Sequence, residues 1–171
     1  NIFVNGMFKN RNEILNIGDK VTISIEDEID NTLPQNIPLD IIYEDMDILA
    51  LNKPPFIVVH PTKSHQENTL SNGIAYYFKE NKIKRKIRLV NRLDMNTSGI
   101  LLVAKSSFAH QQMALQFENN EVEKRYIALV DGIVKKDSGI IDLPIGREEE
   151  KSIRKIVTPS GKDAITKYKV I

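Results

Sequence analysis

Apolar and polar residues alternate along several short stretches of the chain, a pattern typical of half-buried β-strands. Stretches with alternating or continuous apolar residues predict strands over 21–25, 41–43, 48–52, 99–105, 123–130, 140–141 and 164–171. Asn5-Gly6 is a hairpin-turn signal, so residues 1–29 are expected to form a small β element.

Two stretches instead show the three- and four-residue spacing of amphipathic helices. The first covers Thr69–Lys82, with Thr69 or Ser71 as the N-cap. The second begins at Ser106 or Ser107 and runs to about residue 119, with Ala109, Met113 and Phe117 toward the core. Strands outnumber helices and do not strictly alternate with them. The expected fold class is therefore α+β, with a mixed, mainly antiparallel sheet and flanking helices.

Charge is distributed unevenly although the net charge is only +1. Residues 1–50 carry 3 Lys/Arg against 10 Asp/Glu, and residues 51–171 carry 21 against 13. Such asymmetry suggests a polyanionic partner for the basic part. The chain has no cysteine, which excludes disulfide and thiolate chemistry, and no apolar run long enough to span a bilayer.

The densest positive charge lies over residues 79–92, here called the basic stretch. It holds seven basic residues against one acidic residue, Glu80: Lys79, Lys82, Lys84, Arg85, Lys86, Arg88 and Arg92. Two interpretations stay open, a solvated loop or a phosphate-binding surface that gains affinity by releasing counterions.

Directly after the basic stretch, a short polar loop enters a rigid apolar strand. The loop carries Arg92, Asp94, Thr97 and Ser98. A carboxylate held there beside hydrogen-bond donors on a stiff support could react with a substrate. The alternative is structural: Asp94 would cap a turn through Thr97 and Ser98 and pair with Arg92.

At this point the chain resembles the RluA-type RNA pseudouridine synthases. The match covers roughly residues 39–171 and consists of four ordered motifs. They lie at Tyr43–Pro61, Arg92–Lys105, Glu123–Gly132 and Gly161–Val170. The resemblance implies a sheet of the pseudouridine synthase type and an enzyme that isomerises specific uridines in structured RNA, with large-subunit ribosomal RNA favoured over transfer RNA.

The resemblance also implies roles for particular residues. Asp94 corresponds to the nucleophile, and Tyr126 to an aromatic residue that stacks on the flipped uracil. Arg92 would fill the space that the flipped base leaves, next to Thr97 and Ser98 in the substrate-binding loop. The reaction needs no cofactor and no metal. His60, His65 and His110 lack ligand spacing and are expected to be structural or at the surface.

Residues 1–29 resemble the tail of an S4 RNA-binding domain, which predicts three parts: this element, a linker over 30–38 and a catalytic domain over 39–171. The family has a further arginine motif that would follow residue 171. We therefore expect a chain cut short at its C-terminus, and inactive or nearly so in this form. A cytoplasmic monomer without membrane contact is expected.

One residue departs from the family pattern, because Asn91 stands where the family has a histidine. Two other functions compete with the synthase. A non-catalytic RNA-binding protein with a degenerate site would fit this departure. A hydrolase with paired carboxylates would need a second acid near Asp94, and residues 92–102 supply none.

Overall fold

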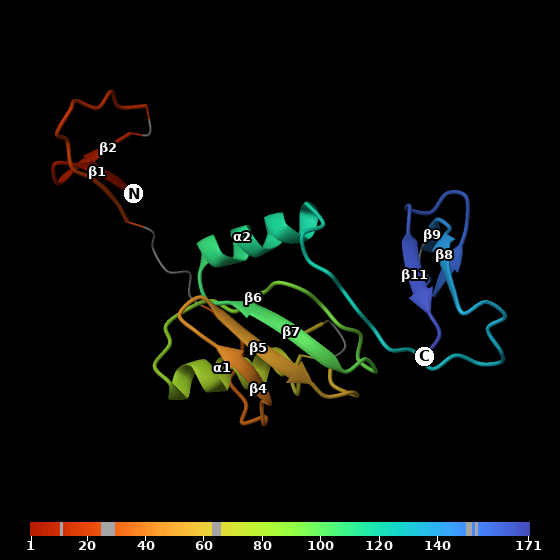
Figure 1. Ribbon diagram of the computed structural model, residues 1–171. Coiled ribbons are helices and arrows are strands. Elements are labelled where there is room, and N and C mark those ends of the chain that lie inside the picture. Colours follow the sequence, from red (N-terminus) through yellow and green to blue (C-terminus); the bar gives the residue numbers. More distant parts are fainter. Residues whose placement is uncertain (11, 25–29, 63–65, 150–151, 153) are drawn as a thin grey trace. The chain divides into compact units, whose positions relative to one another are not determined.

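The computed structural model of the chain describes residues 1–10, 12–24, 30–62, 66–149, 152 and 154–171 (Figure 1). Contacts divide the chain into two compact units, Asn1–Glu123 and Lys124–Ile171. The first unit contains two sheets and both helices. The boundaries predicted from the sequence, after residues 29 and 38, stay predictions.

The main sheet of the first unit has four antiparallel strands in the order β4-β5-β7-β6. These strands are β4 (Ile41–Glu44), β5 (Ile48–Lys53), β6 (Arg88–Leu89) and β7 (Gly99–Ala104). The pairing of β5 with β7 runs over six residues, from Ile48 opposite Ala104 to Lys53 opposite Gly99. The α+β class and the strands predicted around residues 41–52 and 99–105 are confirmed.

Helix α1 (Leu70–Glu80) packs its apolar side on β5 and β7. Thr69 is the N-cap, and Thr69 and Asn72 form a reciprocal capping box that satisfies two amide groups at the start of the helix. The core cluster joins three residues of α1 to strand residues and one loop valine: Leu49, Leu51, Val59, Leu70, Ile74, Phe78, Leu101 and Val103. The predicted first helix is therefore confirmed.

The predicted linker is packed against α1 rather than free of it. The Asn72 side chain donates to the Leu33 carbonyl at 2.8 Å, and the Gln35 amide donates to the Asn72 carbonyl. A side chain at Gly73 would lie 3.0 Å from Cβ of Ile37, which explains a glycine inside this helix. Residues 33–37 are thus fastened to α1, shortly before the chain enters β4.

Helix α2 (Ser107–Glu118) follows β7 and lies beside β7 and β6, with Ser106 as its N-cap. Ala109 is buried, whereas Met113 and Phe117 are only half-buried. The expectation that all three reach the core is confirmed for Ala109 alone.

Three short strands form the N-terminal sheet in the order β2-β1-β3, comprising β1 (Ile2–Val4), β2 (Met7–Lys9) and β3 (Val21–Ile23). The hairpin turn at Asn5-Gly6 is confirmed, and both residues have positive φ. Residue 25, at the end of the predicted strand, lies outside the described residues.

The second unit consists of two antiparallel strand pairs, β8 (Ser138–Asp142) with β11 (Ile165–Lys169) and β9 (Ile145–Arg147) with β10 (Lys155–Val157). The strands near 140 and 165 are confirmed, while β9 and β10 were not predicted. The strand predicted over 123–130 is wrong, because no described strand pairs with it. Its apolar residues stay in solvent, with Ile127 88% and Leu129 103% exposed. Alternation marks a potential strand, but a strand also needs a neighbouring edge.

No helix in the described part of the chain is long and apolar enough to cross a membrane.

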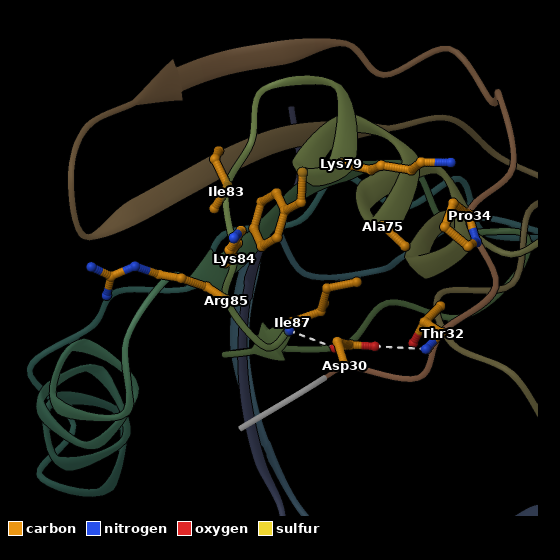
Figure 2. Close-up of a pocket in the computed structure, with 10 residues that line it drawn as sticks. Asp30, Thr32, Pro34, Ala75, Lys79, Ile83, Lys84, Arg85 and Ile87 are labelled. Carbon is orange, nitrogen blue, oxygen red and sulfur yellow. Dashed lines mark hydrogen bonds between the residues drawn. The ribbon is translucent and has the colours of Figure 1, made fainter. Parts of the chain in front are cut away.

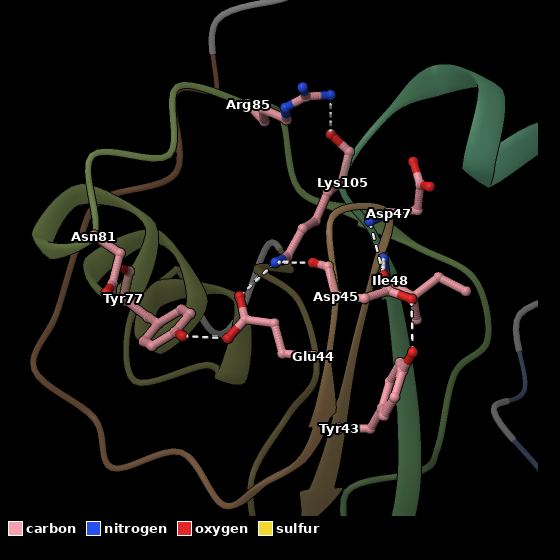
Figure 3. Close-up of polar contacts among 9 residues, drawn as sticks. All are labelled: Tyr43, Glu44, Asp45, Asp47, Ile48, Tyr77, Asn81, Arg85 and Lys105. Carbon is pink, nitrogen blue, oxygen red and sulfur yellow. Dashed lines mark hydrogen bonds and ion pairs between the residues drawn. The ribbon is translucent and has the colours of Figure 1, made fainter.

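A buried lysine fastens the β4–β5 hairpin to the end of β7 (Figure 3). Lys105 is 6% exposed, and its ammonium group donates to the Glu44 carboxylate and to the Asp45 carbonyl. The Tyr77 hydroxyl of α1 donates to the same carboxylate. Partial burial acts to raise the pKa of Glu44, but the hydrogen bonds from Lys105 and Tyr77 outweigh it and keep that pKa below its usual range. These contacts lock three elements together.

Replacing Lys105 by methionine should lower the free energy of unfolding by about 2–4 kcal/mol, because it leaves a half-buried carboxylate without its cation. Urea denaturation at pH 7 measures this change, with the exposed Lys79→Met as the control.

The contribution of Glu44 to the free energy of unfolding should be present above the ordinary carboxyl pKa of 4.5 and disappear as pH falls through the lowered native value. Wild type and Glu44→Gln should therefore converge in stability on acidification. A gap that stayed constant below pH 4 would contradict this assignment.

Candidate functional site

The loop between β6 and β7 places Asp94 at the surface, just before the rigid strand β7. The Thr97 amide donates to the Asp94 carbonyl at 3.1 Å and closes the turn. Within the described residues, the Asp94 carboxylate accepts no hydrogen bond and forms no ion pair. The interpretation of Asp94 as a side-chain cap paired with Arg92 is therefore wrong, since the backbone makes the turn and the carboxylate remains accessible.

Lys53, the last residue of β5, lies fully buried beneath this loop with 0% exposure. Its ammonium group donates to three carbonyls, those of Pro54 (2.9 Å), Met95 (3.0 Å) and Thr97 (2.7 Å). Burial lowers the pKa of Lys53 below its usual range, and the negative charge of Asp94 acts in the opposite direction. Lys53 thus fixes the loop on both sides of residue 96 and places a positive charge near Asp94.

The same loop is fastened at two other points. The Phe56 amide donates to the Met95 carbonyl at 2.7 Å. The Asn91 side chain donates to the Ile100 carbonyl (3.0 Å) and accepts from the Leu102 amide (2.8 Å). The Asn91 side chain therefore forms hydrogen bonds with two backbone groups of β7 beyond the end of β6, as a paired strand would. Asn91 shapes the loop through both of its polar atoms.

The other predicted loop residues occupy distinct positions. Arg92 and Ser98 are exposed, and Thr97 is half-buried. The Arg92 guanidinium has no hydrogen bond or ion pair to any residue that the structure describes. Arg92, Asp94, Thr97 and Ser98 are thus brought together on one loop, with an unengaged cation two residues before an unengaged carboxylate.

Tyr126 belongs to the second unit, where its side chain is 65% exposed in an extended segment. It does not lie within a strand, contrary to the expectation. His60 and His110 are half-buried, and His65 lies outside the described residues. No group of three or more potential metal ligands occurs among the residues whose positions are described.

The signal for the roles of Lys53 and Asn91 in the sequence is weak. From its place in Asn52-Lys53-Pro54, Lys53 is predicted to position a loop or a phosphate rather than to react, and the structure places it under the loop. The usable signal is a lysine at an inward-facing strand position directly before Pro54-Pro55. Nothing in the pattern alone shows that two of its three acceptors lie some forty residues further along the chain.

A model of the RNA pseudouridylate synthase family matches residues 47–171, which include Lys53, Asn91 and the Asp94 loop. The chain belongs to this family. It is 38% identical over 175 residues to the uncharacterized RNA pseudouridine synthase YlyB of Bacillus subtilis (strain 168), covering 99% of this chain and 57% of that protein. It is 34% identical to ribosomal large subunit pseudouridine synthase D of Buchnera aphidicola subsp. Schizaphis graminum, covering 100% and 55%.

Among solved structures, the fold is similar to human RNA pseudouridylate synthase domain containing 1. The TM-score is 0.61 at 26% identity, covering 76% of this chain and 51% of the human chain. The mixed antiparallel sheets with few helices are thus those of pseudouridine synthases. The chain spans somewhat more than half the length of the curated relatives it matches.

Replacing Lys53 by methionine should loosen the Asp94 loop of this synthase family member. Each buried carbonyl that loses its donor costs about 1–3 kcal/mol, so unfolding should become easier by about 2 kcal/mol or more. Hydrogen exchange should accelerate at the Thr97 amide, while the core amides of α1 stay protected. Lys82→Met, at an exposed position, is the control. Unchanged exchange at Thr97 in the Lys53 variant would show that the ammonium group does not hold the loop.

Proposed function

We propose that the protein isomerises specific uridines to pseudouridine in structured RNA, with Asp94 as the nucleophile. In this reaction the bond between ribose C1′ and uracil N1 breaks and a bond between C1′ and C5 forms. The hydrogen at C5 leaves to solvent and N1 takes up a proton, so atoms and electrons balance without an external oxidant. Whether Asp94 attacks the sugar or the uracil ring stays open.

The accessible Asp94 carboxylate is the observation that carries this proposal. A nucleophile must be ionised and must have a free oxygen, whereas a capping aspartate spends its oxygens on backbone amides. The Asp94 carboxylate has no hydrogen-bond partner among the residues that the structure describes, because Lys53, Phe56 and Asn91 hold the loop in its place. The buried Lys53 also places a positive charge near this carboxylate. The site therefore offers a pre-positioned carboxylate to an incoming nucleoside.

The RNA substrate is proposed from two observations. The basic stretch leads directly into the Asp94 loop, and clustered cations attract a polyanion. Relatives named as ribosomal large subunit pseudouridine synthase D favour large-subunit ribosomal RNA. The S4-like nature of residues 1–29, action as a cytoplasmic monomer, and independence from metals remain predictions. So does the expected inactivity of residues 1–171 by themselves.

The competing function, a non-catalytic RNA-binding protein, was favoured by the change to Asn91. In this structure Asn91 has a structural role, because its side-chain amide forms hydrogen bonds with two backbone groups of β7. Asn91→Ala would remove both bonds, whereas a histidine at that position could offer one donor and one acceptor.

Asp94→Asn in the full-length protein should abolish turnover, because an amide has no negative charge with which to form the covalent bond. Tritium release from RNA carrying [5-³H]uridine measures turnover, since the hydrogen at C5 is lost. Binding of the same RNA should change less than about threefold, as expected for a residue outside the phosphate contacts. The exposed Asp131→Asn is the matched control. Retained turnover in the Asp94 variant would refute the proposed nucleophile.

Arg92→Ala should lower turnover on a structured RNA by about 10–100-fold, because extruding a stacked base costs a few kcal/mol that a gap-filling side chain offsets. The defect should shrink on an unstructured RNA with the same uridine, where little stacking is lost. Arg154→Ala, at another exposed arginine, controls for loss of positive charge. Equal defects on both RNAs would assign Arg92 to substrate binding instead of base extrusion.

A further inference from the structure

A second feature of the first unit lies at the other end of β7 from Asp94. It is a cavity of about 520 Å³ between the segment 30–34, helix α1 and residues 83–87 (Figure 2). Its size is within the range of small-molecule sites in proteins. None of its lining residues belongs to the Asp94 loop.

The cavity has an apolar floor, formed by Ala75, Phe78, Ile83 and Ile87. Phe78 belongs to the core cluster, and Ile83 and Ile87 pack against it, so this surface is rigidly supported. An apolar surface suits the face of a nucleobase, because every base has a π-face that gains from stacking in any sequence.

Cations surround the floor, namely Lys79, Lys84 and Arg85. The ammonium groups of Lys79 and Lys84 have no hydrogen bond or ion pair to the residues described. One Arg85 nitrogen donates to the Lys105 carbonyl at 3.2 Å, which leaves other donors of the guanidinium for a ligand.

Among the described residues that line the cavity, Asp30 is the one that opposes these cations with a carboxylate. Its two oxygens accept from the amides of Ile87 (2.7 Å) and Thr32 (2.8 Å), so Asp30 ties the wall of the cavity together. Three cations around one engaged carboxylate leave a net positive rim, which suits a phosphate group.

The path from the cavity to Asp94 follows β6. Residues 88–91 run antiparallel along β7, from Arg88 opposite Ala104 to Asn91 beside Ile100. These four residues at about 3.3 Å each make this part of the path roughly 13 Å long. An RNA strand extending from the reacting uridine along this edge would reach the cavity within a few nucleotides.

We propose that this cavity binds one nucleotide of single-stranded RNA, several positions away from the reacting uridine. The base lies on the apolar lining, and the two phosphates that flank it lie against the cations on the two sides of the cavity, Lys79 and Lys84 with Arg85 (Figure 2). This site rests on the proposed function for its ligand class. It adds a second anchoring point that selects RNA with an unpaired nucleotide at a set distance from the target.

The test uses the full-length protein in an Asp94→Asn background, so that binding is measured without turnover. The probe is a fluorescent single-stranded RNA of twelve nucleotides, titrated at several salt concentrations. The double variant Lys79→Ala/Lys84→Ala should weaken binding about tenfold or more and reduce the salt slope by about 1.4, at roughly 0.7 per phosphate contact. Lys135→Ala/Lys136→Ala, at two exposed lysines outside the cavity, is the control and should leave both the affinity and the salt slope unchanged.

Substitutions that fill the cavity test whether RNA binds inside it or only to the charged surface around it. Ala75→Phe should weaken binding about fivefold or more, because it removes the space for one stacked base, and should leave the salt slope unchanged. Thr32→Tyr fills the same cavity from the opposite wall and serves if Ala75→Phe is misfolded by circular dichroism. If the lysine variant weakens binding while both filled variants bind normally, the cavity holds no nucleotide and the proposal is overturned.

Two further results also decide against it. If neither class of variant changes RNA binding, the cavity is not an RNA site. If a polyglutamate peptide binds as tightly as RNA and loses affinity in the filled variants, the cavity serves an acidic polypeptide. Because every arm measures binding, these outcomes are independent of whether Asp94 proves to be the nucleophile.

Discussion

A single buried ammonium group organises the loop on which the proposed chemistry depends. Lys53 has no access to water, so its three donors must find acceptors inside the protein, and carbonyls on both sides of residue 96 supply two of them. The loop cannot move away without leaving a buried charge unsatisfied. The carboxylate of Asp94 needs no hydrogen bonds of its own to stay in position. The residue proposed to react, Asp94, is thus different from the residue that holds the loop, Lys53. For this reason an exposed aspartate can still be well placed.

The rest of the first unit positions Lys53 itself. The lysine ends β5, and the six-residue pairing of β5 with β7 sets it opposite Gly99, where the loop re-enters the sheet. At the far end of the same strand pair, Lys105 fastens the hairpin through Glu44 and Asp45. The central pair is therefore anchored at both ends by a buried lysine, and α1 covers its apolar face between them. Asn91 completes the edge of β7 between these two anchors.

Local patterns predicted the elements that carry a strong signal in their own sequence. The helix after Thr69 has its own capping box, and the strands near residues 41–52 and 99–105 carry enough apolar residues to identify them. Residues 123–130 have a similar pattern but no described partner strand, and alternation alone cannot supply one. The sequence pattern also could not predict the three acceptors of Lys53, because two of them lie more than forty residues away. The resemblance singled out Asp94, whereas the residues alone also allowed the capping role that the structure contradicts.

Charge placement decides whether an exposed carboxylate can meet RNA at all. Asp94 and the phosphates of a substrate repel each other, and at the surface that repulsion is only partly screened within about 8–10 Å. In the proposed function the basic stretch offsets this repulsion, because its cations precede the loop in sequence and Arg88 lies in β6, the strand before the loop. Residues 51–171 carry 21 Lys/Arg against 13 Asp/Glu, whereas residues 1–50 carry 3 against 10. A negative nucleophile at Asp94, as we propose it, depends on this adjoining positive charge to act on a polyanion.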